Sequence, residues 1–332
     1  MNNVAIPQRA AVIGAGTMGL GVAECFALNG LDVMLVDASP QLSLQAIARL
    51  MARVRGHVDA GLLPESALER ARSVRAAENI SDAVQAADLV LEAVPERIEV
   101  KRAVLAACGA DAPAEAIIAS NTSSLPIDDL AAFVERKNRF LGMHWFNPPE
   151  WTPGVEVIPS AHTTSRVVQI ARDFLLAIGK RPATVASGPG FVANRIQFAL
   201  FREAVACVEE GLATPAEVDE VVRSCFGFRL PFYGPFAIAD MAGLDVYANI
   251  FEVLAPELGA GWAPPPALQD IVDSGRHGVK SLAGFYEYSE DERDALLIER
   301  DKRYAALKKL IDEFSARTLQ NAKMEAACES GA

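Results

Sequence analysis

Three glycines near the N-terminus have the spacing of a dinucleotide-binding turn. Gly14, Gly16 and Gly19 form the pattern GxGxxG, which follows an apolar run at 10–13 and extends into a predicted helix that starts at Thr17. Gly14 would permit a tight turn, Gly16 would let the backbone approach a pyrophosphate, and Gly19 would let the helix pack on the strand. The helix N-terminus offers N–H groups and a partial positive charge to phosphates. The segment therefore predicts a phosphate-binding turn.

Asp37 ends the next apolar run, at 32–37, and indicates which dinucleotide binds. A carboxylate there would accept hydrogen bonds from the adenosine ribose hydroxyls and repel a 2′-phosphate, and no arginine follows in DASP. We therefore expect NAD rather than NADP, with Thr17 and Met18 among the residues that contact it. The alternative is a tight turn of an unrelated fold beside a surface aspartate, which the strand–turn–helix context disfavours.

His144 is the candidate base for an NAD-dependent oxidation of an alcohol. Histidine suits the removal of a hydroxyl proton because its pKa lies near neutrality. The chain has four histidines: His57, His144, His162 and His277. Only His144 closes an apolar run, beside Asn147-Pro148-Pro149, and Glu156 in the next run could fix its tautomer. A buried histidine with a purely structural role remains the alternative unless polar neighbours converge on it.

Polar segments follow the apolar runs at several places. They are SNTSSLP at 120–126, the stretch from 142 to 157, and GPGFVANR at 188–195. Ligands of open α/β sheets bind outside the carboxyl ends of the strands. These segments are therefore expected to line one site.

The order of apolar runs predicts an α/β fold: an N-terminal Rossmann domain with a doubly wound, mostly parallel sheet, followed by an all-helical domain. Short runs at 89–94, 116–120, 140–146, 155–159 and 183–187 alternate with helical stretches, which is typical of a sheet covered on both faces. After Ser187 the patterns are helical. We predict an NAD-binding domain at 1–187 and a helical substrate and dimerisation domain at 188–332.

Charge and cysteine content exclude several classes of partner. The 332-residue chain has 31 Lys and Arg against 43 Asp and Glu, a net charge of −12, which disfavours nucleic acid and anionic membranes. No apolar run reaches the roughly 18 residues of a membrane span. Five scattered cysteines without CxxC spacing predict reduced thiols in the cytoplasm and no metal site.

Several motifs, in order and spacing, resemble the 3-hydroxyacyl-CoA dehydrogenase family over nearly the whole chain. They are GAGTMG, VPERIEVKR, SNTSS, HxFNPP followed by VEV, PGFVANR, GPF at 234–236 and GFYEY at 284–288. The resemblance implies a Rossmann domain, a helical second domain that forms a homodimer interface, and NAD as oxidant. It also implies reversible oxidation of an (S)-3-hydroxy group to a 3-keto group.

The resemblance implies a role for individual residues. His144 would be the general base and Glu156 its orienting partner, and Ser123 and Asn194 would donate hydrogen bonds to the substrate oxygen. Four further residues would contact the cofactor, the first three of them on its nicotinamide half: Glu96, Lys101, Asn147 and Lys280. For Glu96, Lys101 and Lys280 the alternative is ordinary solvated charge.

One departure from the family leaves the substrate open between a CoA ester and a short free hydroxy acid. Family members that act on CoA esters usually carry lysines after the second strand, where this chain has Asp59 and Ala60. Arg53 and Arg55 lie one or two turns earlier and could compensate. The sequence is also similar to the lambda-crystallin/L-gulonate 3-dehydrogenase branch and to L-carnitine dehydrogenase, which act on free hydroxy acids or, in the crystallins, serve as structural proteins.

Two other interpretations remain. Dehydrogenases of the 6-phosphogluconate type share the glycine turn but use a lysine base in the second domain, for which Lys280 would be tested. A non-catalytic, crystallin-like NAD-binding protein is the second, and the presence of Ser123, His144, Glu156 and Asn194 argues against it.

Overall fold

The computed structural model describes residues 6–329, and the side chains as far as residue 314. The chain divides into two compact units, Met1–Phe201 and Arg202–Ala332. The division falls inside helix α8 (Ala193–Glu209), whereas the boundary predicted at 187 stays a prediction. Within residues 6–329, no helix combines the length and the apolar character that crossing a membrane requires.

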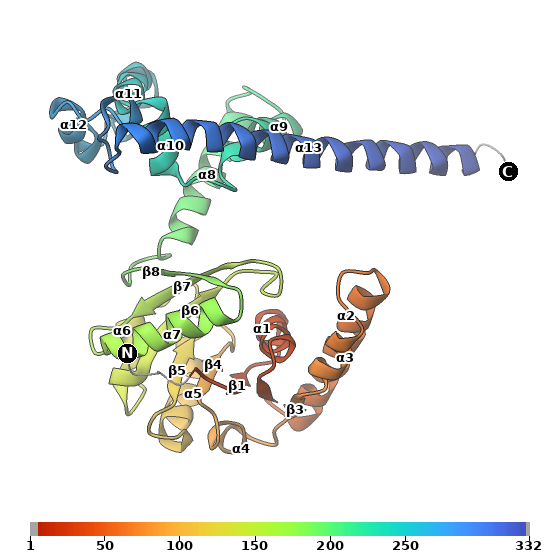
Figure 1. The fold of residues 1–332 in the computed structure, drawn as a ribbon. Helices are drawn as coiled ribbons and strands as arrows, with labels where there is room; N and C mark the ends of the chain where they lie inside the picture. The colour runs from red at the N-terminus through yellow and green to blue at the C-terminus, as the bar shows by residue number, and fades with distance from the viewer. Residues whose placement is uncertain (1–5, 330–332) are drawn as a thin grey trace. The chain divides into compact units, whose positions relative to one another are not determined.

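The first unit is built on an eight-stranded sheet with the order β3-β2-β1-β4-β5-β6-β7-β8. Figure 1 shows this unit with the helices that pack around the sheet. The strands are β1 (Arg9–Ile13), β2 (Asp32–Val36), β3 (Val74–Ala76), β4 (Leu89–Glu92), β5 (Ile117–Ser120), β6 (Phe140–Trp145), β7 (Gly154–Pro159) and β8 (Arg181–Thr184). All neighbouring strands are parallel except β6 and β7, which are antiparallel. The mostly parallel sheet is therefore confirmed, although the short strand β3 was not predicted.

Helices cover both faces of this sheet. One core layer contains α1 (Thr17–Leu28), α2 (Pro40–Asp59), α3 (Ser66–Ala71) and α7 (Ser165–Ala177); the other contains α4 (Ile80–Val84), α5 (Ile98–Asp111) and α6 (Ile127–Ala131). Alternate residues of a strand face opposite layers, as Val12 and Ile13 do. A sheet buried on both faces needs apolar residues throughout its strands, so a charged residue inside a strand is a sign of function.

The second unit is helical, as predicted. Its α-helices are α9 (Pro215–Ser224), α10 (Pro235–Ala242), α11 (Leu244–Leu258), α12 (Pro266–Asp273) and α13 (Glu290–Glu329). Its short 3-10 helices are η2 (Gly227–Arg229), η3 (Ala260–Trp262) and η4 (Val279–Ser281), whereas the 3-10 helix η1 (Lys137–Arg139) belongs to the first unit. A small core is formed around Ala239, Leu244, Ala248 and Leu268. In the described part of this unit, β structure is limited to isolated bridges at 278–287.

Candidate active site

The glycine turn lines a cavity of about 610 Å³ in the first unit. Its walls include the predicted cofactor residues Gly14, Gly16, Thr17, Met18 and Asp37. They also include Ala93, Val94 and Pro95 from the connection between β4 and α5. The cavity therefore spans the carboxyl ends of β1, β2 and β4, where a dinucleotide binds in this class of fold.

Glycine suits each of these three positions for a different structural reason. Gly14 has φ +104°, and a Cβ there would lie 2.6 Å from the Ala93 carbonyl oxygen. A Cβ on Gly19 would lie 1.9 Å from the carbonyl oxygen of Gly14, so only glycine lets α1 approach the turn. A Cβ on Gly16 would meet nothing within 4 Å. Because no side chain caps the N–H groups at the start of α1, this open edge fits a pyrophosphate group.

Asp37 lines the same cavity. Its carboxylate accepts hydrogen bonds from the N–H groups of Ala15 and Ala38, both at 2.7 Å. Backbone bonds fix the carboxylate while each oxygen keeps a free lone pair for a hydroxyl donor. The residues present therefore fit NAD.

The structure brings His144 and Glu156 together. They are directly opposite in the antiparallel register of β6 and β7, so both side chains lie on the same face of the sheet. His144 Nδ1 is 2.8 Å from Glu156 Oε2, and each residue is only 5% exposed. With the carboxylate ionised, the shared proton lies on Nδ1, which leaves Nε2 able to accept a proton.

Glu156 is also tied to the start of α8. Its other oxygen, Oε1, accepts hydrogen bonds from the N–H groups of Val192 at 3.0 Å and Ala193 at 2.9 Å. The next residue, Asn194, donates from Nδ2 to the carbonyl oxygen of Ser123 at 3.1 Å. All four predicted catalytic residues are therefore joined in one chain of contacts, and Asn194 keeps a second amide hydrogen free.

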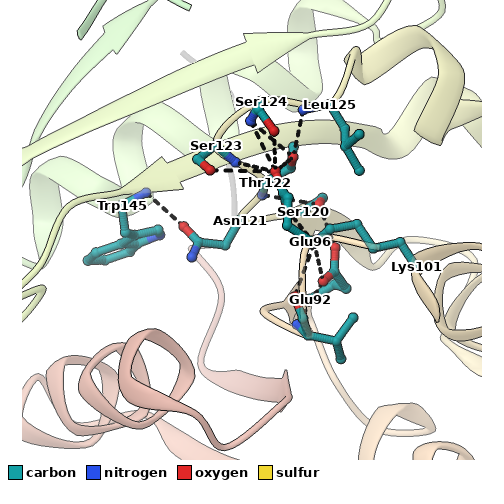
Figure 2. Close-up of polar contacts among 11 residues, drawn as sticks. Glu92, Glu96, Lys101, Ser120, Asn121, Thr122, Ser123, Ser124, Leu125 and Trp145 are labelled. Carbon is teal, nitrogen blue, oxygen red and sulfur yellow. Dashed lines mark hydrogen bonds and ion pairs between the residues drawn. The ribbon is translucent and has the colours of Figure 1, made fainter. Parts of the chain in front are cut away.

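Glu96 anchors the segment that carries Ser123 (Figure 2). Its Oε1 accepts from the Thr122 hydroxyl at 2.5 Å and from the N–H groups of Ser123 and Ser124 at 2.9 and 3.0 Å. Burial acts to raise the pKa of Glu96, but these hydrogen bonds and the Lys101 ammonium together lower it below its ordinary value. The carboxylate is thus held ionised beside Ser123.

Lys101 is not a solvated charge, so that alternative was wrong for this residue. Its side chain is 1% exposed, and Nζ lies 2.7 Å from the carboxylate of Glu92 and 3.2 Å from that of Glu96 (Figure 2). Nζ also donates to the Val94 carbonyl oxygen at 3.3 Å. The described contacts of Lys101 are therefore directed into the protein.

Glu92, which sequence reasoning missed, is the buried partner of this lysine. It closes β4, is 0% exposed, and accepts from the Ser120 hydroxyl at 2.5 Å and from the Val94 N–H at 2.8 Å. Glu92 and Ser120 are paired in register on the adjacent strands β4 and β5. A glutamate inside the apolar run LVLEAV was the signal that could have found it.

A further contact links the serine segment to the histidine strand. The side-chain oxygen of Asn121 accepts from the Trp145 N–H at 2.8 Å, immediately after His144 (Figure 2). The ends of β4, β5 and β6 are therefore joined by polar contacts rather than by packing alone.

Two predicted cofactor residues are not joined to this network by contacts among the described residues. Asn147 is exposed and follows β6 at a cis bond to Pro148. Lys280 belongs to the second unit, where its ammonium lies 2.6 Å from a carboxylate oxygen of Asp245. Their proposed contacts with NAD, and the interpretation of Lys280 as a base, stay predictions.

The two arginines of α2 that could have replaced the missing lysines are both paired with carboxylates. Arg53 contacts the buried Glu24 at 2.5 Å and Glu150 at 3.8 Å. Arg55 lies 4.0 Å from Asp59 and 3.6 Å from Glu65. The suggested compensation is therefore not supported, because neither arginine is a free cation.

Comparison with known proteins agrees with this geometry. The family model for the NAD-binding domain of 3-hydroxyacyl-CoA dehydrogenase matches residues 9–188, and the model for its C-terminal domain matches residues 190–288. These matches, together with the homologues below, show an oxidoreductase that uses NAD and acts on a CH–OH group, interconverting 3-hydroxyacyl and 3-keto forms.

The 5-formyl-3-hydroxy-2-methylpyridine 4-carboxylate 5-dehydrogenase of Mesorhizobium japonicum is 36% identical over 305 residues, 91% of this chain and 97% of that protein. A 3-hydroxybutyryl-CoA dehydrogenase of Bradyrhizobium diazoefficiens is 35% identical over 286 residues, 86% of this chain and 96% of that protein. The crystal structure of the (S)-3-hydroxybutyryl-CoA dehydrogenase of Ralstonia eutropha is similar with a TM-score of 0.63 and 35% identity, covering 86% of this chain and all of that one. The chain therefore belongs to the 3-hydroxyacyl-CoA dehydrogenase family.

Proposed function

We propose that His144, Glu156, Ser123 and Asn194 form the catalytic site for oxidation of an (S)-3-hydroxy group. The proposal rests on the hydrogen bonds that link these four residues: His144 to Glu156 directly, Glu156 to the backbone at the start of α8, and the Asn194 side chain to the backbone carbonyl of Ser123. The cofactor would be held by Gly14, Gly16, Thr17, Met18, Gly19 and Asp37, with Glu96, Lys101, Asn147 and Lys280 assigned to it from the family resemblance. For Lys101, the burial of Nζ favours an indirect contribution through Glu92 and Glu96.

Each residue has a distinct part in the reaction. Bound NAD would supply the acceptor for the hydride that leaves the substrate C–H bond. Nε2 of His144 accepts the hydroxyl proton, and Glu156 stabilises the resulting imidazolium because it is hydrogen-bonded to Nδ1. The Ser123 hydroxyl and the free amide hydrogen of Asn194 would stabilise the charge that develops on the substrate oxygen.

Replacement of the base tests this assignment. General acid–base catalysis contributes typically about 10²- to 10⁴-fold, so His144→Gln should lower kcat at least 100-fold in a steady-state NADH assay. The Kd for NADH, measured by fluorescence titration, should stay within about twofold. His162→Gln, on an exposed histidine, is the control and should behave as the wild type. Wild-type turnover in His144→Gln would remove the histidine from the mechanism.

A specific observation favours a short free hydroxy acid over a CoA ester. The resemblance would place CoA phosphates near the end of α2, where Arg53 and Arg55 are engaged by carboxylates and Asp59 adds a negative charge. A screen of paired 3-hydroxy acids and their CoA esters, with NADH formation as the readout, decides between them. Higher kcat/KM on the free acids would support this second proposal, and higher kcat/KM on the esters would contradict it.

We further propose that the protein is a cytoplasmic homodimer. Helix α11 has two apolar faces: Leu244 and Ala248 are buried in the second unit, whereas Val246, Ile250 and Val253 are 44%, 51% and 73% exposed. An exposed apolar stripe opposite the buried face of a helix is typical of an interaction surface, and we assign the cover to a second copy of this chain. The cytoplasmic location follows from the scattered cysteines; Cys25, Cys108, Cys207 and Cys225 are free, and the side chain of Cys328 lies outside the described part.

A further inference from the structure

Glu92, Glu96 and Lys101 form a charged cluster with more acidic than basic groups. One ammonium lies 2.7 Å from the first carboxylate and 3.2 Å from the second. No other ion pair to either carboxylate occurs among the residues whose side chains are described. With both carboxylates ionised, the cluster has one negative charge in excess. The Glu92 and Lys101 side chains are 0% and 1% exposed and that of Glu96 is 34% exposed, so water screens this charge only in part.

The cluster lies against the wall of the dinucleotide cavity. The N–H of Val94 donates to Glu92 at 2.8 Å, and Lys101 Nζ donates to the carbonyl oxygen of Val94 at 3.3 Å. Val94 itself lines the cavity. Val94 therefore separates the charged cluster from the space in which the cofactor fits.

The cluster is also next to the reacting atoms if the proposed function holds. Glu96 accepts a hydrogen bond from the N–H of Ser123 at 2.9 Å, and Ser123 is assigned to the substrate oxygen. Reacting atoms must approach to about 3–3.5 Å. The nicotinamide ring is therefore expected on the order of 10 Å or less from the Glu96 carboxylate. This step rests on the proposed function.

The nicotinamide ring is cationic when oxidised and neutral when reduced, so a nearby fixed charge distinguishes the two forms. We propose that the excess negative charge of the Glu92–Lys101–Glu96 cluster favours binding of NAD⁺ over NADH, with Glu96 as the residue that supplies it. At about 10 Å and the effective dielectric constant of a partly buried site, one unit charge changes a binding ratio by up to about tenfold.

This preference shifts the balance between substrates and products bound to the enzyme, without changing the overall equilibrium of the reaction in solution. A group that binds the oxidised cofactor more tightly stabilises the complex of alcohol and NAD⁺ relative to the complex of ketone and NADH. Compared with an uncharged site, it also leaves NADH more weakly bound relative to NAD⁺. The cluster thus suits an enzyme that oxidises its hydroxy substrate and releases NADH.

The test is the ratio of two dissociation constants, Kd for NAD⁺ divided by Kd for NADH. NADH binding is measured by fluorescence titration and NAD⁺ binding by calorimetry on the full chain. Glu96→Gln removes the charge but keeps an oxygen acceptor for the serine segment, and we expect the ratio to rise about three- to tenfold. Glu96→Asp keeps the charge, and its ratio should stay within about twofold of the wild type.

The matched control is Glu99→Gln, the same change at an exposed glutamate of α5. Its ratio should equal that of the wild type. If Glu96→Gln weakens both cofactors equally, or if Glu99→Gln changes the ratio as much, the inference is overturned. Failure of the proposed function is separate: it would appear as wild-type kcat in His144→Gln and Ser123→Ala, whatever the cofactor ratio.

Discussion

Single residues with little freedom to change define the cofactor turn. Gly14 needs its positive φ, and Gly19 needs the absence of a Cβ, because its backbone lies against the turn. Gly16 is different, since the space beside it is open in the protein itself. Stability and cofactor binding can therefore be separated at two glycines three residues apart.

Alanine at Gly19 and at Gly16 should have different effects. Gly19→Ala places a Cβ 1.9 Å from the Gly14 carbonyl oxygen, so urea unfolding should show a loss of about 1–3 kcal/mol together with weaker NADH binding. Gly16→Ala should unfold within about 0.5 kcal/mol of the wild type but bind NADH at least about tenfold more weakly, because the Cβ occupies pyrophosphate space.

Gly56→Ala in α2 is the control for this pair, because its Cβ also meets nothing within 4 Å. It should leave NADH affinity unchanged and raise stability by up to about 1 kcal/mol. Wild-type NADH affinity in Gly16→Ala would show that the phosphates do not approach this turn.

Glu96 should make stability depend on acid pH. Its hydrogen bonds and Lys101 outweigh burial and hold its pKa below the ordinary 4.5. The stabilisation is therefore complete above about pH 4.5 and is lost as the pH falls toward the lower pKa of the folded state. Urea unfolding at pH 6 and pH 4 should show a smaller acid loss in Glu96→Gln than in the wild type or in Glu99→Gln. Equal acid losses in all three proteins would mean that Glu96 has the same pKa folded and unfolded.

At the scale of elements, the β6–β7 pair and its connection position the two side chains proposed as base and orienting partner. The antiparallel register places His144 opposite Glu156, and the residues between the strands must return the chain without disturbing it. Lys180, which is 6% exposed, donates from Nζ to the carbonyl oxygens of Pro149 at 2.6 Å and Thr152 at 2.9 Å. Its ammonium also lies 5.5 Å from the Trp145 ring centroid. A buried cation thus fixes the connection that carries Asn147.

Lys180→Met should loosen this connection while the sheet remains folded. Two carbonyl groups lose their hydrogen-bond donor, which should lower the free energy of unfolding by about 1–3 kcal/mol. Removal of a buried charge offsets part of this loss. Hydrogen exchange followed by mass spectrometry should speed up at residues 147–153. Arg181→Met, at the exposed neighbouring position, is the control and should leave exchange there unchanged. Wild-type protection of this segment in Lys180→Met would assign its rigidity to packing.

At the scale of the whole molecule, the exposed face of α11 predicts the assembly. The double variant Ile250→Glu/Val253→Glu places charges at residues that are 51% and 73% exposed, so the fold of one chain should tolerate it. Light scattering after size-exclusion chromatography should give a dimer mass for the wild type and a monomer mass for the variant. The control is Leu212→Glu, another exposed apolar residue, which should stay dimeric. A monomeric wild type would refute the homodimer, and a dimeric double variant would refute α11 as its interface.

The sequence by itself determined the features that depend on local spacing. The glycine spacing and the apolar strand runs were enough to predict the Rossmann fold and the cofactor turn. The position of His144 in one of these runs was enough to single it out. Turn geometry and strand burial act on neighbouring residues, so local patterns reveal them. The same local patterns predicted the helical second unit, in which a local motif also starts α9: the side chains of Thr214 and Glu217 form a capping box there.

Only the tertiary structure decided which charges are buried and paired. The contact of His144 with Glu156 depends on strand register, and the spacing of two residues along the chain does not fix register. Glu92 and Lys101 appear in sequence as two ordinary charges, and the crossing of α5 over β4 turns them into a buried pair. The sequence presents Arg53 as a cation that could bind a phosphate, whereas in the fold it is paired with Glu24 of α1. Each of these contacts joins different elements, so its energy depends on packing that local patterns do not encode.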